Sequence, residues 1–361
     1  MKRTTMLMLC GLTCLVAMAG KKSSAKILLD RLGELQQKGI MIGHQDALFY
    51  GTTWKWEFGR SDMKDVCGDF PAVLGCELSG LDFGKEKNID GVPFQHMRQQ
   101  IISFAQQGGI ITLSWHPDNP LNGLDAWNVE GKAVEAVLPQ GQKHDDMVQR
   151  INKIICFIKS LKTADGKAIP VIFRPWHEMS GDWFWWGTRQ CTTEQYKALF
   201  QMTHQLFEKA HVNQVVWCYS PGADAKDTPE HYFSFYPGDA YVDLLGVDLY
   251  QFASDEEFIR MGQNEMKIMH NYSLSHHKLF ALTETGYRNT PNASWFTTVL
   301  EQAVKGFRPS YILFWRNAWD KKEENFGPAP EKNCANDFRK FHDNPDLLFL
   351  SDIRTKINPQ K

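Results

Sequence analysis

Short apolar runs rich in β-branched residues recur along this chain and alternate with stretches whose apolar residues are spaced three and four apart. A run that is apolar at nearly every position predicts a strand buried on both faces, as in a parallel sheet. Eight such runs lie at residues 39–45, 71–79, 109–116, 169–178, 213–221, 242–250, 278–286 and 310–319.

The stretches between these runs are typical of amphipathic helices, and the clearest examples are residues 92–107, 145–161, 193–210 and 255–272. Strands that alternate with helices predict a parallel sheet covered on its outer face, and eight units are the number found in a (β/α)8 TIM barrel. A doubly wound open sheet is the alternative. It is disfavoured because no strand is followed by a glycine-rich nucleotide-binding turn.

The N-terminus has the pattern of a secretory signal peptide. Two basic residues precede an apolar run that ends in the small-residue sequence Ala-Met-Ala at 17–19. We therefore expect residues 1–19 to be a signal peptide and the protein to be exported, either to the periplasm or out of the cell. Lipid anchoring through Cys10 or Cys14 is the less favoured alternative, because the residues before them match a lipoprotein signal poorly.

The rest of the chain, 20–361, is expected to be a single domain, since no linker, repeat or low-complexity tract interrupts it. It also contains no apolar run of ~20 residues, so no membrane-spanning segment is predicted. A content of 43% hydrophobic and 23% charged residues is typical of a globular protein, and we expect a monomer. The formal net charge of −2 provides no basic field for nucleic acid, so a neutral substrate fits better.

In a TIM barrel the active site is built at the carboxyl ends of the strands, so the residues that end each run are the candidates for chemistry. These residues are polar or aromatic in every run. In chain order they are His44 and Gln45; Glu77; Trp115 and His116; Arg174, Trp176, His177 and Glu178; Tyr219; Asp248 and Tyr250; Glu284; and Trp315 and Arg316.

Glu178 and Glu284 each end an otherwise apolar strand, the fourth and the seventh, where an unused carboxylate would be costly. Two carboxyl groups facing one cleft are the minimum for glycoside hydrolysis, in which one donates a proton and the other attacks. The alternative is that each glutamate only pairs with an arginine. The aromatic segment 181–186 favours a sugar, because indole faces stack on pyranose rings; each of its three tryptophans could equally belong to the core.

Metal-dependent hydrolysis is the main chemical alternative. The segment 177–182 begins like a zinc-binding H-E-x-x-H helix but lacks the second histidine. His116, His177 and Glu178 could still converge on a metal ion, although the histidines and aspartates that such sites use are sparse. We therefore expect neither a metal ion nor a cofactor. No serine nucleophile elbow is present, and no cysteine motif marks a nucleophile.

Several of these strand ends resemble glycoside hydrolase family 26, and the chain is most similar to a β-mannanase of that family. The matching segments are GHQDALFYG, SWHPDNP, RPWHEMSGDWFWWG, WCYSPG, GVDLYQ, LTETGY and FWRNAW, and the third is the most specific. The resemblance implies retaining, double-displacement cleavage of β-1,4-mannosidic linkages in mannan, glucomannan or galactomannan, by endo action or by release of mannobiose. Alternatives are β-1,3-xylan or mixed-linkage glucan as substrate, or a glycan-binding barrel without activity.

The resemblance also implies roles for individual residues. Glu178 would be the acid/base and Glu284 the nucleophile. The surrounding positions would bind substrate or support the two glutamates: Arg174 orients Glu284, Tyr250 faces it, His177 precedes the acid/base, His116 serves the central subsite, Trp183 lies beside the acid/base, Trp315 lies under the reacting sugar, and Arg316 contacts the next sugar on the non-reducing side. We expect an indole-rich, poorly hydrated setting to raise the pKa of Glu178.

Overall fold

A computed structural model describes residues 22–354 of the chain. Eight parallel strands form a barrel that closes because β1 pairs with both β2 and β8. The strands are β1 (Ile40–Gln45), β2 (Val73–Glu77), β3 (Ile110–Trp115), β4 (Val171–Pro175), β5 (Val215–Tyr219), β6 (Leu244–Gln251), β7 (Leu279–Tyr287) and β8 (Tyr311–Phe314). A two-residue strand, β9 (Leu347–Leu348), adds to β1. The predicted (β/α)8 TIM barrel is confirmed.

The near-continuous apolar runs have a direct cause, since every residue of β1 to β5 and β8 is buried. Each strand lies within a few residues of its predicted limits. The exception is the eighth run, where the strand ends at Phe314 rather than at residue 319. There the chain leaves the sheet and folds back on itself through a bridge between Asn317 and Asn325.

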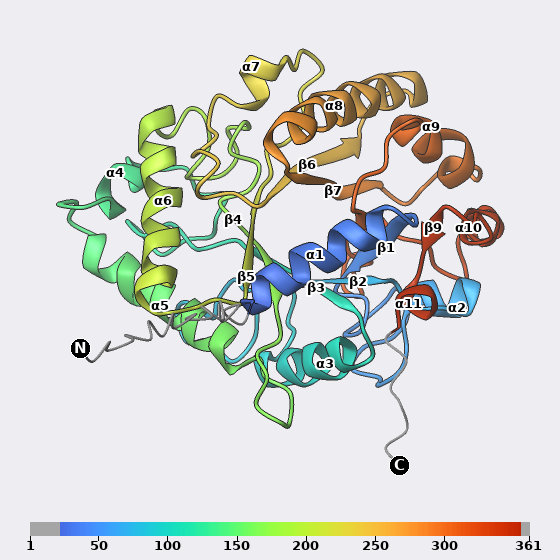
Figure 1. The fold of residues 1–361 in the computed structure, drawn as a ribbon, viewed down its shortest axis with the longest axis horizontal. Helices are drawn as coiled ribbons and strands as arrows, with labels where there is room; N and C mark the ends of the chain where they lie inside the picture. The colour runs from blue at the N-terminus through green and yellow to red at the C-terminus, as the bar shows by residue number, and fades with distance from the viewer. Residues whose placement is uncertain (1–21, 355–361) are drawn as a thin grey trace, which may run out of the picture.

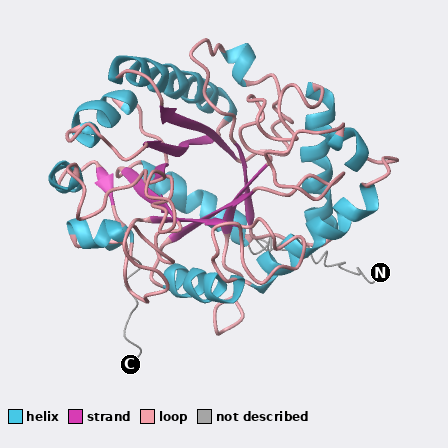
Figure 2. Cartoon of the chain, turned by 180° about the vertical axis from the view of Figure 1, so that it is seen from behind, coloured by secondary structure: helices cyan, strands magenta, loops and turns pink. Residues whose placement is uncertain are grey.

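Helices form a ring outside the barrel (Figure 2). The four helices predicted most clearly are α3 (Phe94–Gln106), α5 (His144–Ser160), α6 (Thr193–Lys209) and α8 (Asp255–His276). Shorter helices are α2 (Asp62–Cys67), α4 (Ala133–Val137), α7 (Pro229–Tyr232), α9 (Glu301–Val304), α10 (Ala335–His342) and α11 (Leu350–Ile353), with a π-helical turn η1 (Phe296–Leu300) before α9. Local sequence defines their starts: Thr192 and Gln195 form a capping box before α6.

The first helix, α1 (Ser24–Gln36), lies across the amino-terminal end of the barrel (Figure 1). The Ala25 amide donates to the Asn213 carbonyl at 3.0 Å, just before β5. Arg31 reaches the carbonyls of Gly108 and Ile353 at 2.5 and 2.9 Å. Because this end is covered, the carboxyl ends of the strands form the open mouth.

The predicted signal peptide, with Cys10 and Cys14, lies outside the described residues, so export stays a prediction. Between Lys22 and Arg354 there is no helix whose length and apolar character would let it cross a bilayer. The six cysteines in this part of the chain are all free thiols.

Candidate active site

The segment after β4 holds Glu178 through an unusual backbone conformation. Both Trp176 and Glu178 have a φ of 55°, in the left-handed region that non-glycine residues rarely adopt. Hydrogen bonds to neighbouring residues fix this turn. Trp176 accepts from the Tyr196 hydroxyl at its carbonyl, at 2.8 Å, and its indole donates to Thr203 at 3.0 Å. The Glu178 amide donates to the Ser220 carbonyl at 2.7 Å. Strain held in this way is common at functional sites, and here it sets the position of Glu178.

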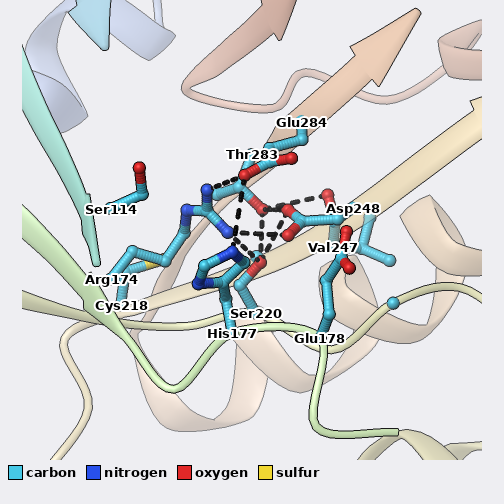
Figure 3. Close-up of polar contacts among 12 residues, drawn as sticks. Ser114, Arg174, His177, Glu178, Cys218, Ser220, Val247, Asp248, Thr283 and Glu284 are labelled. Carbon is cyan, nitrogen blue, oxygen red and sulfur yellow. Dashed lines mark hydrogen bonds and ion pairs between the residues drawn. The ribbon is translucent and has the colours of Figure 1, made fainter. Parts of the chain in front are cut away.

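Glu284 lies within β7, opposite Asp248 of β6 in the sheet register. The buried Arg174 side chain from β4 reaches between these two carboxylates (Figure 3). Its Nη1 donates to Asp248 Oδ2 at 2.6 Å, and its Nη2 donates to Glu284 Oε1. The Tyr250 hydroxyl donates to the other Glu284 oxygen at 2.6 Å. Both oxygens of Glu284 therefore accept a hydrogen bond, one of them from a cation.

Asp248 keeps Arg174 in place. Its second oxygen accepts from the hydroxyls of Ser220 at 2.8 Å and Thr283 at 2.7 Å, and all these groups are buried. Burial alone would destabilise the Arg174 cation, but Asp248 and Glu284 outweigh that effect and raise its pKa. The sequence marked Asp248 only as a strand end. Its role as the partner of Arg174 could not be read from the sequence.

The half-buried Glu178 carboxyl has a pKa well above its ordinary value. Burial is the main cause, and the nearby carboxylates of Asp248 and Glu284 add to it. The Trp183 indole donates to Glu178 Oε2 at 2.7 Å and acts in the opposite direction. The direction of the shift is the one expected from the sequence, but this indole opposes it, because an N–H donor stabilises the ionised carboxylate.

Two histidines connect the site to the end of β2. His116 donates from Nδ1 to the buried carboxylate of Glu77 at 2.8 Å, and its amide donates to the same group at 2.9 Å. The Nε2 atoms of His116 and His177 are 3.1 Å apart. Burial lowers the pKa of His177 well below its ordinary value, with Arg174 and His116 adding to the effect. Burial opposes the charge on His116 too, but Glu77 outweighs it and raises that pKa. The lowered pKa favours the neutral form of His177.

His177, Asp248 and Glu284 place potential metal ligands within 4.8 Å of one another. The Arg174 guanidinium, however, already donates to both carboxylates of this group and supplies the positive charge there. A cation would have to displace that buried ion pair. The chemistry of the donor set therefore fits an arginine-held carboxylate better than a metal centre.

The remaining predicted residues lie around β8. Trp315 is half-buried, and its ring lies 6.2 Å from that of His116. Arg316 is buried and forms ion pairs with Asp90 at 2.8 Å and Glu324 at 2.8 Å. Asp90 belongs to the long loop after β2, so this loop is fastened to the end of β8.

The three tryptophans of segment 181–186 have different surroundings. Trp185 and Trp186 are buried, and their indoles donate to the carbonyls of Pro117 and His177, both at 2.8 Å. They belong to the core. Trp183 is 42% exposed beside Glu178. Sequence reasoning left all three open, because neighbours in a tight turn point in different directions.

Sequence reasoning missed another aromatic residue, Trp127, in the long loop after β3. Its ring stacks on His116 with 5.3 Å between centroids and 13° between planes, and 49% of the residue is exposed. An indole with one face on a site histidine and the other side open to solvent is placed for a sugar. The length of the loop was the signal that could have pointed to it.

A parallel barrel whose mouth holds one arginine-held glutamate and one half-buried glutamate with a raised pKa defines a glycoside hydrolase of the TIM-barrel class. The model of Glycosyl hydrolase family 26 matches residues 18–314. The chain belongs to this family.

Curated relatives and solved structures agree with this assignment. A mannan endo-1,4-β-mannosidase of Bacillus subtilis is 30% identical, over 82% of this chain and 77% of that protein. One from Bifidobacterium adolescentis is also 30% identical over 82% of this chain, but the chain spans only 31% of its length. The structure of a family 26 β-mannanase from Bacteroides ovatus is similar with a TM-score of 0.90 and 39% identity, covering 94% of this chain and all of the other.

Proposed function

We propose that this protein hydrolyses β-1,4-mannosidic linkages in mannan, glucomannan or galactomannan, with retention of configuration at the anomeric carbon. The substrate is supported by its relatives, which are mannan endo-1,4-β-mannosidases and a β-mannanase. The single observation that carries the mechanism is the contrast between the two carboxyl groups. Glu178 has a raised pKa in a half-buried setting, whereas Glu284 accepts hydrogen bonds from Arg174 and Tyr250.

In this mechanism Glu178 protonates the glycosidic oxygen while Glu284 attacks the anomeric carbon, so the leaving sugar departs and a glycosyl-enzyme ester forms. Glu178, now ionised, takes a proton from water, and the resulting hydroxide attacks the same carbon. The bond to Glu284 breaks, and both groups return to their starting states. Arg174 and Tyr250 orient Glu284 for attack and stabilise it as the leaving carboxylate.

The other predicted residues act on the substrate or support the two glutamates. Neutral His177 and the Glu77-bound His116 offer hydrogen bonds to the hydroxyls of the reacting sugar, and Trp315 lies under its apolar face. Arg316, which its ion pair with Asp90 holds in position, contacts the next sugar on the non-reducing side. Trp183 positions the Glu178 carboxyl.

Reducing-end release from linear mannan, with β-1,3-xylan and mixed-linkage glucan in parallel, tests the proposal. We expect release from mannan, with the product of the first turnovers in the β configuration by NMR. Faster release from either of the other glycans would contradict mannan as the substrate. If none of the three glycans is cleaved, the remaining function is a glycan-binding barrel without activity. The products over time separate the two modes of action, since early mannobiose alone means exo action and a ladder means endo action.

The rate should depend on pH as a bell-shaped curve whose alkaline limb reports the loss of the proton that Glu178 must donate. Because the pKa of Glu178 is raised, activity is retained at pH values where an ordinary glutamate would already be ionised, and it falls as the pH rises through that pKa. Trp183→Phe removes a hydrogen bond that lowers this pKa. We expect its alkaline limb to move to higher pH in kcat/KM profiles, and a limb that stays in place would contradict the assignment of Glu178.

We also propose that residues 1–19 direct export and are removed, as the basic, apolar and small-residue pattern of that segment supports. Mass spectrometry of the protein recovered from an exporting host tests this. Cleavage after Ala19 is expected. A lipid-modified Cys10 or Cys14 would instead establish a membrane anchor.

A further inference from the structure

The two glutamates divide the barrel mouth into two sides. Glu178 follows β4 and Glu284 lies in β7, so β5 and β6 lie between them on one side, and β8, β1, β2 and β3 lie between them on the other. The second side holds the charged groups that surround His116 and Arg316. On the side formed by β5 and β6, the exposed aromatic residues are Trp183 and Phe252.

Trp183 identifies the β5–β6 side as the one that receives the leaving sugar. Its indole donates to Glu178, and its ring lies against the loop after β5, where a Cβ added at Gly222 would be 3.4 Å from it. Ser180 joins the same loop by donating to the Gly222 carbonyl at 2.7 Å. The acid must face the oxygen that leaves with the departing sugar, so this sugar lies over β5 and β6.

Phe252 is an exposed aromatic residue on this rim. It directly follows β6 and is 81% exposed, more than any other large apolar side chain between Lys22 and Arg354. Its ring lies 6.1 Å from that of Tyr250, with 35° between the planes. Since the Tyr250 hydroxyl donates to Glu284, the exposed phenyl ring is continuous with the active site.

The backbone that carries Phe252 is firmly held. Buried Gln251 donates to Asp255 at 2.6 Å and accepts from the Trp295 indole at 2.5 Å. Asn292 donates to the other oxygen of Asp255 at 2.9 Å. The ring is therefore presented to solvent from a fixed base, and an exposed phenylalanine lacks the stabilisation that burial of its ring would give. A ligand that covers the ring recovers part of this.

We propose that Phe252 is a stacking platform for a sugar unit on the leaving-group side of the cleaved bond. This inference rests on the proposed function. A phenyl ring offers no hydrogen bond and no charge, so it suits the apolar face of a neutral pyranoside. The same position accepts an incoming sugar after the first step. Its hydroxyl oxygen then attacks the anomeric carbon, the ester bond to Glu284 breaks, and Glu178 takes the hydroxyl proton, which gives transglycosylation instead of hydrolysis.

Phe252→Ala tests the platform on two substrates. A manno-oligosaccharide places a sugar on Phe252, whereas an aryl mannobioside with an activated phenol as its leaving group does not. We expect kcat/KM for the oligosaccharide to fall about tenfold and kcat/KM for the aryl glycoside to change less than about twofold. The ratio of transglycosylation to hydrolysis should also fall about tenfold. Phe252→Trp should retain the wild-type kcat/KM for the oligosaccharide and the wild-type ratio of transglycosylation to hydrolysis. Leu274→Ala is the matched control, since it removes another exposed apolar side chain, 66% exposed in α8.

The outcomes separate this inference from the proposed function. An active wild type with an unchanged Phe252→Ala variant would overturn the platform alone. An equal loss on both substrates would also overturn it, because Phe252 would then act through Tyr250 on the chemistry itself. A wild type that releases nothing from mannan would overturn the proposed function and the platform with it.

Discussion

Glu284→Gln is expected to abolish mannan hydrolysis, with kcat reduced by about 10⁴-fold or more. An amide cannot form the glycosyl-enzyme ester, yet it keeps the shape of the carboxyl group and can still accept a hydrogen bond from Arg174, whose other partner, Asp248, is untouched. The protein should therefore fold normally. Reducing-sugar release and thermal unfolding, measured on the same preparation, check both parts.

Glu230→Gln is the matched control, because it makes the same change at an exposed glutamate in α7. We expect this variant to keep full activity. A well-folded Glu284→Gln variant that retained even a hundredth of wild-type kcat would show that another group attacks the anomeric carbon. Asp248 would then be the next candidate, because it is the other carboxylate that Arg174 holds.

Glu178→Ala is expected to reduce kcat on mannan by about 10²–10⁴-fold, because the leaving sugar then departs without a proton. A substrate with an activated aryl leaving group needs no such help in the first step, so the glycosyl-enzyme should form and accumulate. Azide can attack that intermediate without a general base, and the product should be a glycosyl azide of retained configuration. A burst of phenol followed by azide-dependent turnover is the measurement.

The same azide experiment on Glu284→Ala provides the comparison. With the nucleophile removed, azide attacks from the opposite face and gives an azide of inverted configuration. Rescue of Glu178→Ala with inversion, or no rescue on an activated substrate, would assign the acid/base role to another residue. The stereochemistry of the azide product thus distinguishes the two glutamates by role.

Much of the fold was determined by local pattern. A strand buried on both faces must be apolar along its length, and an active-site residue at its end must be polar, so the eight runs and their last residues could be found directly. The same reasoning paired Glu178 with Glu284. It was wrong at the end of the eighth run, which was extended to Trp319 although the strand ends at Phe314. The pattern there reflects a folded-back loop rather than a strand.

Other features depend on contacts between distant parts of the chain. Arg174 could be matched to Glu284 by family resemblance. Its second partner, Asp248, lies in β6, and the hydroxyls that hold Asp248 come from Thr283 of β7 and from Ser220 directly after β5. The raised pKa of Glu178 likewise combines burial with the charges of carboxylates on β6 and β7. Sequence reasoning expected a poorly hydrated, indole-rich setting to raise this pKa. Burial is the main cause of the rise, although the nearest indole opposes it through its hydrogen bond.

The sequence by itself therefore determined the barrel, the two glutamates and the family, because each depends on residues close together in the chain or on a short motif. The tertiary structure decided which tryptophans are core, which carboxylate holds Arg174 and which side of the mouth carries Phe252. These depend on barrel closure and on the left-handed turn at Trp176 and Glu178, which set distances and directions between side chains that no local spacing encodes.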